Sequence, residues 1–230
     1  MIENERTQLL DHWRQRLRKN PDWISNKLRQ VELVFKASRG DAAAIASLNS
    51  YLRQFHDKLG FKAKQSVKQG GLCAGAIFRT EKFIATSDRV GAKKEQVKTV
   101  HIEHTVPVNV LESEIQKQRF PDYPAALAWL LKHSVTTAFH QKEEEFVRSR
   151  ARDTGALDST SSEYMRPFMR YERLHSAEGI VWNVFDGVKI DPKQFTFCDH
   201  FEIVCRLLEA AEASPQMLSV LRSIASQLTH

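Results

Sequence analysis

A glutamate and a histidine stand side by side near the middle of the chain, at Glu103 and His104, and Pro107 follows three residues after the histidine. They close a stretch rich in β-branched residues, which predicts a strand over residues 97–104. A carboxylate can hold a divalent cation, and a neutral imidazole can take a proton from an attacking water. The pair therefore indicates metal-assisted hydrolysis of a phosphodiester bond. The alternative is a structural pair, a solvent-exposed strand glutamate beside a core histidine. The chain has nine histidines, so a Glu-His pair can arise by chance.

A second stretch extends this pattern. Residues 134–139 predict a strand, and the strongly charged residues 141–150 predict a helix. Together with Glu103-His104-Thr105-Val106-Pro107 this order resembles the HNH, or ββα-metal, nuclease family, over about a quarter of the chain. In that family the first strand carries an acidic residue and a histidine, and a proline follows. The second strand leads into a helix that carries another metal ligand.

The resemblance implies a role for each matching residue. Glu103 would bind one hard cation, Mg²⁺ or Mn²⁺, through oxygen. His104 would be the general base, because its intrinsic pKa of about 6.5 leaves the imidazole largely neutral at working pH. His140 and Glu144 would complete the metal site from the helix, with Glu143 as the alternative ligand. A charged helix face with no metal is the competing interpretation for these helix residues.

The chain departs from the family pattern in two ways. His133 stands where the family usually has an asparagine that orients the base, so it becomes the candidate for that role. The family's frequent zinc-binding cysteine pairs are absent, because Cys73, Cys198 and Cys205 are widely spaced. We therefore expect reduced thiols and a motif held together by hydrophobic packing.

The charge balance fits an anionic partner. Lys and Arg number 34 against 28 Asp and Glu, a formal net charge of +6. Two basic clusters are candidates for contacts to phosphates or bases. The alternative is a solvated loop for the first cluster and a connection with a buried aromatic pair for the second. The first cluster is Arg89, Lys93 and Lys94, and the second is Arg166, Arg170 and Arg173, interleaved with Phe168 and Tyr171. The expected partner is DNA, with RNA and a homodimer left open.

Three classes of function remain in competition. The leading hypothesis is a Mg²⁺-dependent DNA endonuclease, for example a restriction enzyme or an enzyme encoded by a phage. The second is a nucleic-acid-binding protein without catalysis, and the third is a structural or regulatory protein of a phage or mobile element. No P-loop, GxGxxG, GxSxG or CxxC motif occurs, which disfavours nucleotide-dependent, dinucleotide-binding and elbow-type hydrolase functions. No signal peptide and no long apolar stretch are found, so we expect a cytoplasmic protein and no membrane partner.

The pattern of elements predicts an α+β fold. We expect a helical N-terminal region over residues 1–60, a ββα-metal-like core over 61–150 and a C-terminal α+β region over 151–230. Apolar residues at helical spacing predict three helices in the first region, the third capped by Asp41.

Further elements are expected downstream. Short strands are predicted over 72–78 and 83–86, and a short helix over 124–131. A hairpin is predicted over 180–190 with its turn at Asp186-Gly187. Two closing helices follow, the first capped by Asp199 and the second opened by Ser214-Pro215.

Overall fold

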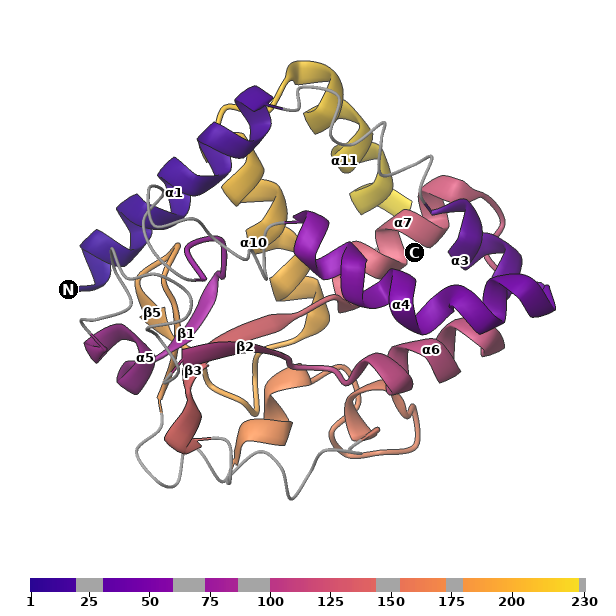
Figure 1. The fold of residues 1–230 in the computed structure, drawn as a ribbon, viewed down its shortest axis with the longest axis horizontal. Helices are drawn as coiled ribbons and strands as arrows, with labels where there is room; N and C mark the ends of the chain where they lie inside the picture. Colours follow the sequence, from indigo (N-terminus) through magenta and orange to yellow (C-terminus); the bar gives the residue numbers. More distant parts are fainter. Residues whose placement is uncertain (20–30, 60–72, 87–99, 144–153, 173–179, 228–230) are drawn as a thin grey trace.

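The computed structural model describes residues 1–19, 31–59, 73–86, 100–143, 154–172 and 180–227. It has the predicted α+β fold, with a small sheet and helices packed around it (Figure 1). The sheet has the strand order β2-β3-β1-β4-β5, in which β1 and β3 are parallel and the other neighbours are antiparallel. The strands are β1 (Phe78–Thr80), β2 (Val100–His104), β3 (Thr136–His140), β4 (Val181–Asn183) and β5 (Val188–Lys189).

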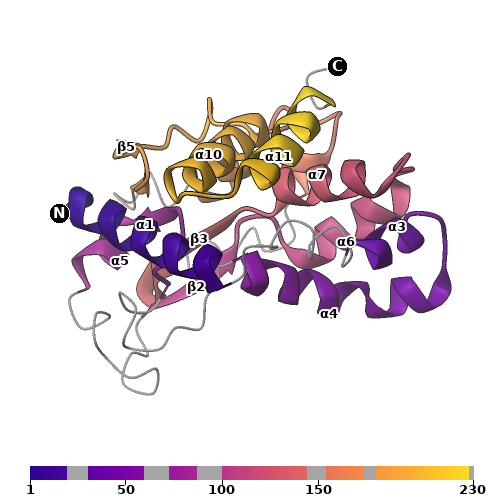
Figure 2. The same ribbon diagram turned by 90° about the horizontal axis from the view of Figure 1, so that it is seen from above.

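Helices cover the sheet from both sides. Figure 2 shows α10 and α11 on one side of β2 and β3, and α4 on the other. The α-helices are α1 (Ile2–Lys19), α3 (Glu32–Ala37), α4 (Ala42–Leu59), α5 (Glu81–Ala85), α6 (Val108–Lys117), α7 (Tyr123–His133), α10 (Phe197–Ala210) and α11 (Pro215–Gln227). The described residues also form the short 3₁₀ helices η2 (Gln141–Glu143), η3 (Gly155–Leu157) and η4 (Pro167–Tyr171).

Several helix starts follow the local sequence signals. The Asp41 carboxylate accepts a hydrogen bond from the Ala44 amide at 2.8 Å, which is the predicted cap of α4. The first closing helix, α10, begins earlier than predicted. Thr196 is its N-cap, and Asp199 is the third helical residue, whose carboxylate bonds back to the Thr196 amide in a capping box.

The predicted strand over 83–86 is wrong, because these residues belong largely to α5. The Thr80 hydroxyl accepts from the Phe83 amide at 3.2 Å and starts the helix directly after β1. The strand predicted over 72–78 is also displaced, since β1 begins only at Phe78. The helix α6 was not predicted, although Leu111 and Ile115, one turn apart, are both fully buried. Part of the predicted second helix lies outside the described residues.

The β4–β5 hairpin is confirmed. Its turn contains Gly187 at a φ of 71°, a left-handed conformation that glycine adopts without strain. Buried side chains from all three predicted regions join one hydrophobic cluster, as Trp13, Phe139 and Leu207 illustrate. The division into three regions therefore stays a prediction from sequence.

Candidate functional site

Glu103 and His104 lie on opposite faces of the sheet. Glu103 pairs with Thr137, and His104 pairs with Thr136, in regular antiparallel register. Successive side chains of a strand point to opposite faces. The carboxylate therefore shares a face with Thr137, whereas the imidazole shares the other face with Thr136. The strand does not present the acid and the imidazole side by side, as the metal-site hypothesis requires.

The Glu103 carboxylate is held by an arginine from η4. Its Oε1 accepts from Arg170 Nη2 at 2.5 Å, and its Oε2 lies 3.5 Å from the Tyr171 hydroxyl. The second terminal nitrogen of the guanidinium, Nη1, donates to the carbonyl oxygens of His104 at 2.8 Å and Thr105 at 3.2 Å. We call this set of Glu103, Thr105, Arg170 and Tyr171 the η4 clamp.

The η4 clamp is mostly withdrawn from solvent. The Arg170 side chain is 6% exposed and that of Glu103 is 25% exposed. Burial and the neighbouring Glu103 charge raise the pKa of Tyr171, so its hydroxyl stays protonated and available as a donor. One guanidinium thus ties a carboxylate to two backbone carbonyls where the chain leaves β2. This arrangement fixes the bend between β2 and α6.

His104 occupies a packed position. Its side chain is 7% exposed. It shares its face of β2 with Ile102, and the neighbouring Ala138 of β3 lies on the same face and is fully buried. A general base must reach the water that it deprotonates. The described surroundings of His104 are those of a core histidine.

Two of the predicted ligands, His140 and Glu143, lie at the other end of the strand pair. His140 pairs with Val100, four residues along β3 from the partner of His104, which is about 13 Å of strand. The Glu143 carboxylate is fully buried. It accepts from the Thr80 hydroxyl at 2.6 Å and from the His140 amide at 2.9 Å. Burial raises the pKa of Glu143, and these two hydrogen bonds oppose that effect.

The remaining metal and base candidates do not join Glu103 within the described chain. Glu144 lies outside the described residues. His133 ends α7, where its Nδ1 lies 2.7 Å from the Trp129 carbonyl and its ring centroid lies 4.6 Å from that of Phe197. Burial lowers the pKa of His133 to about 3, so the ring is neutral. Among the described residues, no three His, Cys, Asp or Glu side chains form a group that could hold a metal.

The second basic cluster is divided between the core and the surface. Phe168 and Tyr171 are fully buried, and Phe168 packs 4.9 Å from Phe78, centroid to centroid. They cannot stack on bases, so the buried-aromatic alternative is correct. Arg166 is half-buried, and its Nη1 lies 3.4 Å from the Ser162 carbonyl. Arg89, Lys93, Lys94 and Arg173 lie outside the described residues.

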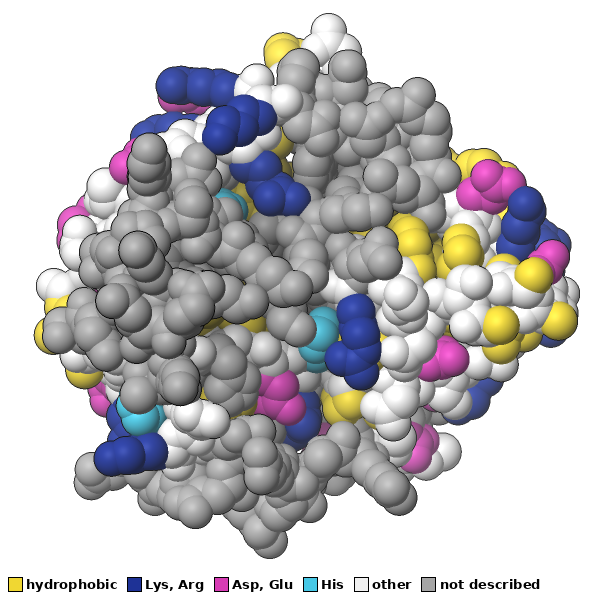
Figure 3. Space-filling view, in the orientation of Figure 1, with side chains coloured by type: hydrophobic (Ala, Val, Ile, Leu, Met, Phe, Trp, Pro, Cys, Tyr) yellow, Lys and Arg dark blue, Asp and Glu magenta, His cyan; other side chains and the backbone are white. Residues whose placement is uncertain are grey.

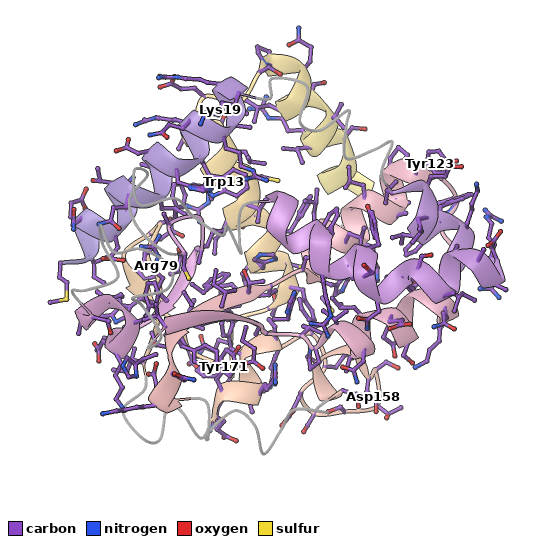
Figure 4. All side chains as sticks on the ribbon, viewed as in Figure 1. Trp13, Lys19, Arg79, Tyr123, Asp158 and Tyr171 are labelled. Atoms are coloured by element: carbon purple, nitrogen blue, oxygen red, sulfur yellow. The ribbon has the colours of Figure 1, made fainter. Side chains whose placement is uncertain are left out.

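A second buried arginine was missed by the sequence analysis. Arg79 of β1 is fully buried and forms an ion pair with Glu5 of α1. It also donates to the carbonyl oxygens of Ala74 at 2.7 Å and Ala76 at 2.9 Å. Figure 4 shows Arg79 between α1 and the sheet. A charged residue directly after the apolar run from Ala74 to Phe78 was the available signal.

A surface groove leads toward the η4 clamp. It encloses about 570 Å³ between α6 and residues 154–159. A smaller cavity beside it shares Val110 and Leu157 and reaches Arg170. The charged side chains of the groove are Glu114, Lys117 and Asp158, an excess of acid that suits phosphate poorly.

Charge is distributed unevenly along the chain. The described residues carry 21 Lys and Arg and 21 Asp and Glu, so the net charge of +6 comes entirely from the other segments. Residues 60–72 and 87–99 alone hold seven Lys and Arg against two acidic residues. Figure 3 shows a further group of basic side chains over the C-terminal end of α1, which carries Arg16, Arg18 and Lys19 in its last turn.

Comparison with protein-family models, with curated proteins and with solved structures gives no match for this chain. Among the described residues, no helix combines the length and the apolar character that crossing a membrane requires.

Proposed function

We propose that the chain is a nucleic-acid-binding protein in which Glu103 and His104 stabilise the fold rather than hydrolyse a phosphodiester. The observation that carries the proposal is the distribution of charge. A charge-balanced framework is joined to segments with an excess of six positive charges. Lysine and arginine bind nucleic acid by displacing counterions from its phosphates, a contribution that needs no base contact.

Two segments outside the described residues, the basic residues 87–99 and the charge-balanced residues 144–153, are attached to the framework at one place. Val100, where residues 87–99 rejoin the sheet, pairs with His140. Glu143, after which residues 144–153 begin, is bonded to Thr80 at the start of α5. The described ends of both segments therefore lie at one end of the β2–β3 pair. Arg89, Lys93 and Lys94 belong to the first of these segments.

Salt dependence tests the proposal. We would measure binding of fluorescein-labelled duplex and single-stranded oligonucleotides by fluorescence anisotropy between 50 and about 200 mM salt, in EDTA and in Mg²⁺. The expected affinity falls steeply with salt, with a log–log slope of about −0.9 per neutralised phosphate of duplex DNA. Mg²⁺ should not strengthen binding, because as a competing counterion it can only weaken contacts to phosphate. Affinity no greater than that of an unrelated protein of the same net charge would overturn the proposal.

A metal-dependent endonuclease is the second candidate. In its favour, the Glu103 side chain keeps 25% exposure and is followed by His104 and by Pro107, the N-cap of α6. The predicted ligand Glu144 is outside the described residues, so its contribution stays a prediction. Plasmid DNA would be incubated with the protein in EDTA and then in Mg²⁺ or Mn²⁺. Cleavage that is lost in His104→Ala would establish this candidate, and intact plasmid with the wild-type protein would exclude it.

A further inference from the structure

Two arginines of the described surface have no carboxylate partner. Arg39 donates to the Phe120 carbonyl at 3.0 Å, and Arg119 donates to the carbonyls of Ser38 and, at 2.8 Å, Gln118. The bonds from Arg39 to Phe120 and from Arg119 to Ser38 join the same two stretches of chain, 38–39 and 119–120. The two arginine side chains therefore lie close together. Both arginines are exposed, and neither is part of an ion pair within the described chain. Within the described residues, no carboxylate neutralises these two positive charges.

The acidic side chains nearby are already engaged. Glu32 pairs with Lys36 at 2.7 Å. Asp41 and Asp122 are the N-terminal caps of α4 and α7, where their carboxylates accept from the Ala44 and Ala125 amides, both at 2.8 Å. A carboxylate in that position is offset by the positive end of the helix dipole. Because the helix end is equivalent to about half a positive charge, the two cap carboxylates neutralise Arg39 and Arg119 only in part.

Aromatic rings lie beside these arginines. The Arg39 guanidinium carbon lies 4.3 Å from the centroid of the Phe35 ring. The Tyr123 ring meets Phe35 edge to face, with centroids 4.9 Å apart and planes at 85°. Tyr123 is 39% exposed, so part of its ring is open to solvent. Figure 4 shows Tyr123 at the outer edge of the molecule, beside α3.

We propose that Arg39, Arg119, Phe35 and Tyr123 form a binding site for single-stranded nucleic acid, which we call the α3–α7 patch. Arginine binds the phosphates, and an exposed aromatic ring supplies a face for an unpaired base. A duplex keeps its bases stacked inside, so it would use the charges but not the ring. This inference rests on the proposed nucleic-acid binding and names the strand type and the residues.

The test compares single-stranded and duplex oligonucleotides of equal length on ring and charge variants. Tyr123→Ala should weaken single-strand binding roughly 5- to 150-fold, the loss expected for one stacked base, and change duplex binding less than about twofold. Tyr123→Phe keeps the ring and should bind as the wild type does. Arg119→Gln should reduce the salt slope for the single strand by about 0.7, one phosphate contact.

The controls are matched to the surface. Tyr164→Ala removes another exposed tyrosine, 45% exposed and on a different segment, and should leave binding unchanged. Circular dichroism and thermal melting confirm that each variant is folded. Unchanged single-strand binding by Tyr123→Ala, or an equal loss in Tyr164→Ala, overturns the α3–α7 patch while leaving the proposed function standing. Absence of salt-sensitive binding by the wild-type protein overturns both.

Discussion

Arg170 and Glu103 are 67 residues apart in the sequence, and their side chains meet at 2.5 Å. The same guanidinium also bonds the carbonyl oxygens of His104 and Thr105. The acid of the nuclease-like motif is thereby engaged in holding the chain where it leaves β2. The consequences of this contact can be measured in solution.

Removing Arg170 should destabilise the protein strongly. Breaking a buried ion pair leaves an uncompensated charge, which costs about 3–5 kcal/mol. Because Glu103 is partly exposed, we expect Arg170→Met to fall near the lower end of that range. Unfolding in urea measures the free energy of unfolding of each variant. A double-mutant cycle with Glu103→Gln then gives the interaction free energy between Arg170 and Glu103. The exposed pair Arg222–Glu209 is the control, since Arg222→Met should cost under about 1 kcal/mol. Equal costs for Arg170→Met and Arg222→Met would contradict the η4 clamp.

The Glu5–Arg79 pair should be the larger determinant of stability. Both side chains are essentially unexposed, and the pair joins α1 to β1. Glu5→Gln should lower the free energy of unfolding by about 3–5 kcal/mol, because the guanidinium would remain buried without its counter-charge. Glu3→Gln, on the exposed side of the same helix, is the matched control. A cost for Glu5→Gln no larger than that for Glu3→Gln would show that the pair does not anchor α1.

Buried histidines should make the protein acid-sensitive. Burial lowers the pKa of His133 to about 3 and those of His12 and His200 to about 4. The unfolded chain therefore binds more protons than the folded one below about pH 6.5, and the stability these residues contribute above that pH is lost as pH falls.

The size of the effect can be read from unfolding at several pH values. Each histidine should contribute about 1.4 kcal/mol per pH unit between its unfolded and folded pKa values. Urea unfolding at pH 7, 6 and 5 measures the slope. His133→Phe should flatten it by one histidine's share, since Trp129 and Phe197 already surround the ring. If the free energy of unfolding depends on pH equally in the wild type and in His133→Phe, the pKa of His133 is not lowered in the folded protein.

Glu143 should behave in the opposite sense. Its pKa is raised, so the stabilising neutral form is fully present below the ordinary carboxyl pKa and is lost as pH rises through the folded value. Glu143→Gln stays neutral and can still accept from Thr80 and His140. The variant should be at least as stable as wild type at pH 7. Glu143→Ala should cost about 1–3 kcal/mol, because it leaves the hydroxyl and the amide unsatisfied. An equal loss of stability in Glu143→Gln and Glu143→Ala would mean that the fold needs the negative charge of Glu143.

Local signals in the sequence were sufficient for part of this fold. The β-branched stretch before Glu103 and the turn at Asp186-Gly187 are strong patterns. The strand β2 occurs over the described part of the predicted range 97–104, and the predicted hairpin occurs as β4 and β5. Residues 83–86 form a short apolar run, which cannot be assigned to strand or helix by periodicity alone. The cap at Thr80 decides in favour of α5.

The candidate site was only partly visible in the sequence. A strand over 97–104 already places adjacent side chains on opposite faces, so the separation of Glu103 from His104 could have been foreseen. The partner of Glu103 could not, because Arg170 is brought to it only by tertiary packing of η4. Arg39 and Arg119 are likewise 80 residues apart in the sequence and come together only in the folded chain.

The most direct test of this account is the binding of labelled DNA by wild-type protein and by Glu103→Gln, each in EDTA and in Mg²⁺ at equal ionic strength. The substitution keeps the size of the side chain and removes its charge, and circular dichroism shows whether the fold is retained. The account predicts that Glu103→Gln binds as the wild type does in each medium, that Mg²⁺ strengthens binding by neither protein, and that the DNA stays intact. Mg²⁺-dependent cleavage or tighter binding by the wild-type protein, lost in Glu103→Gln, would contradict it.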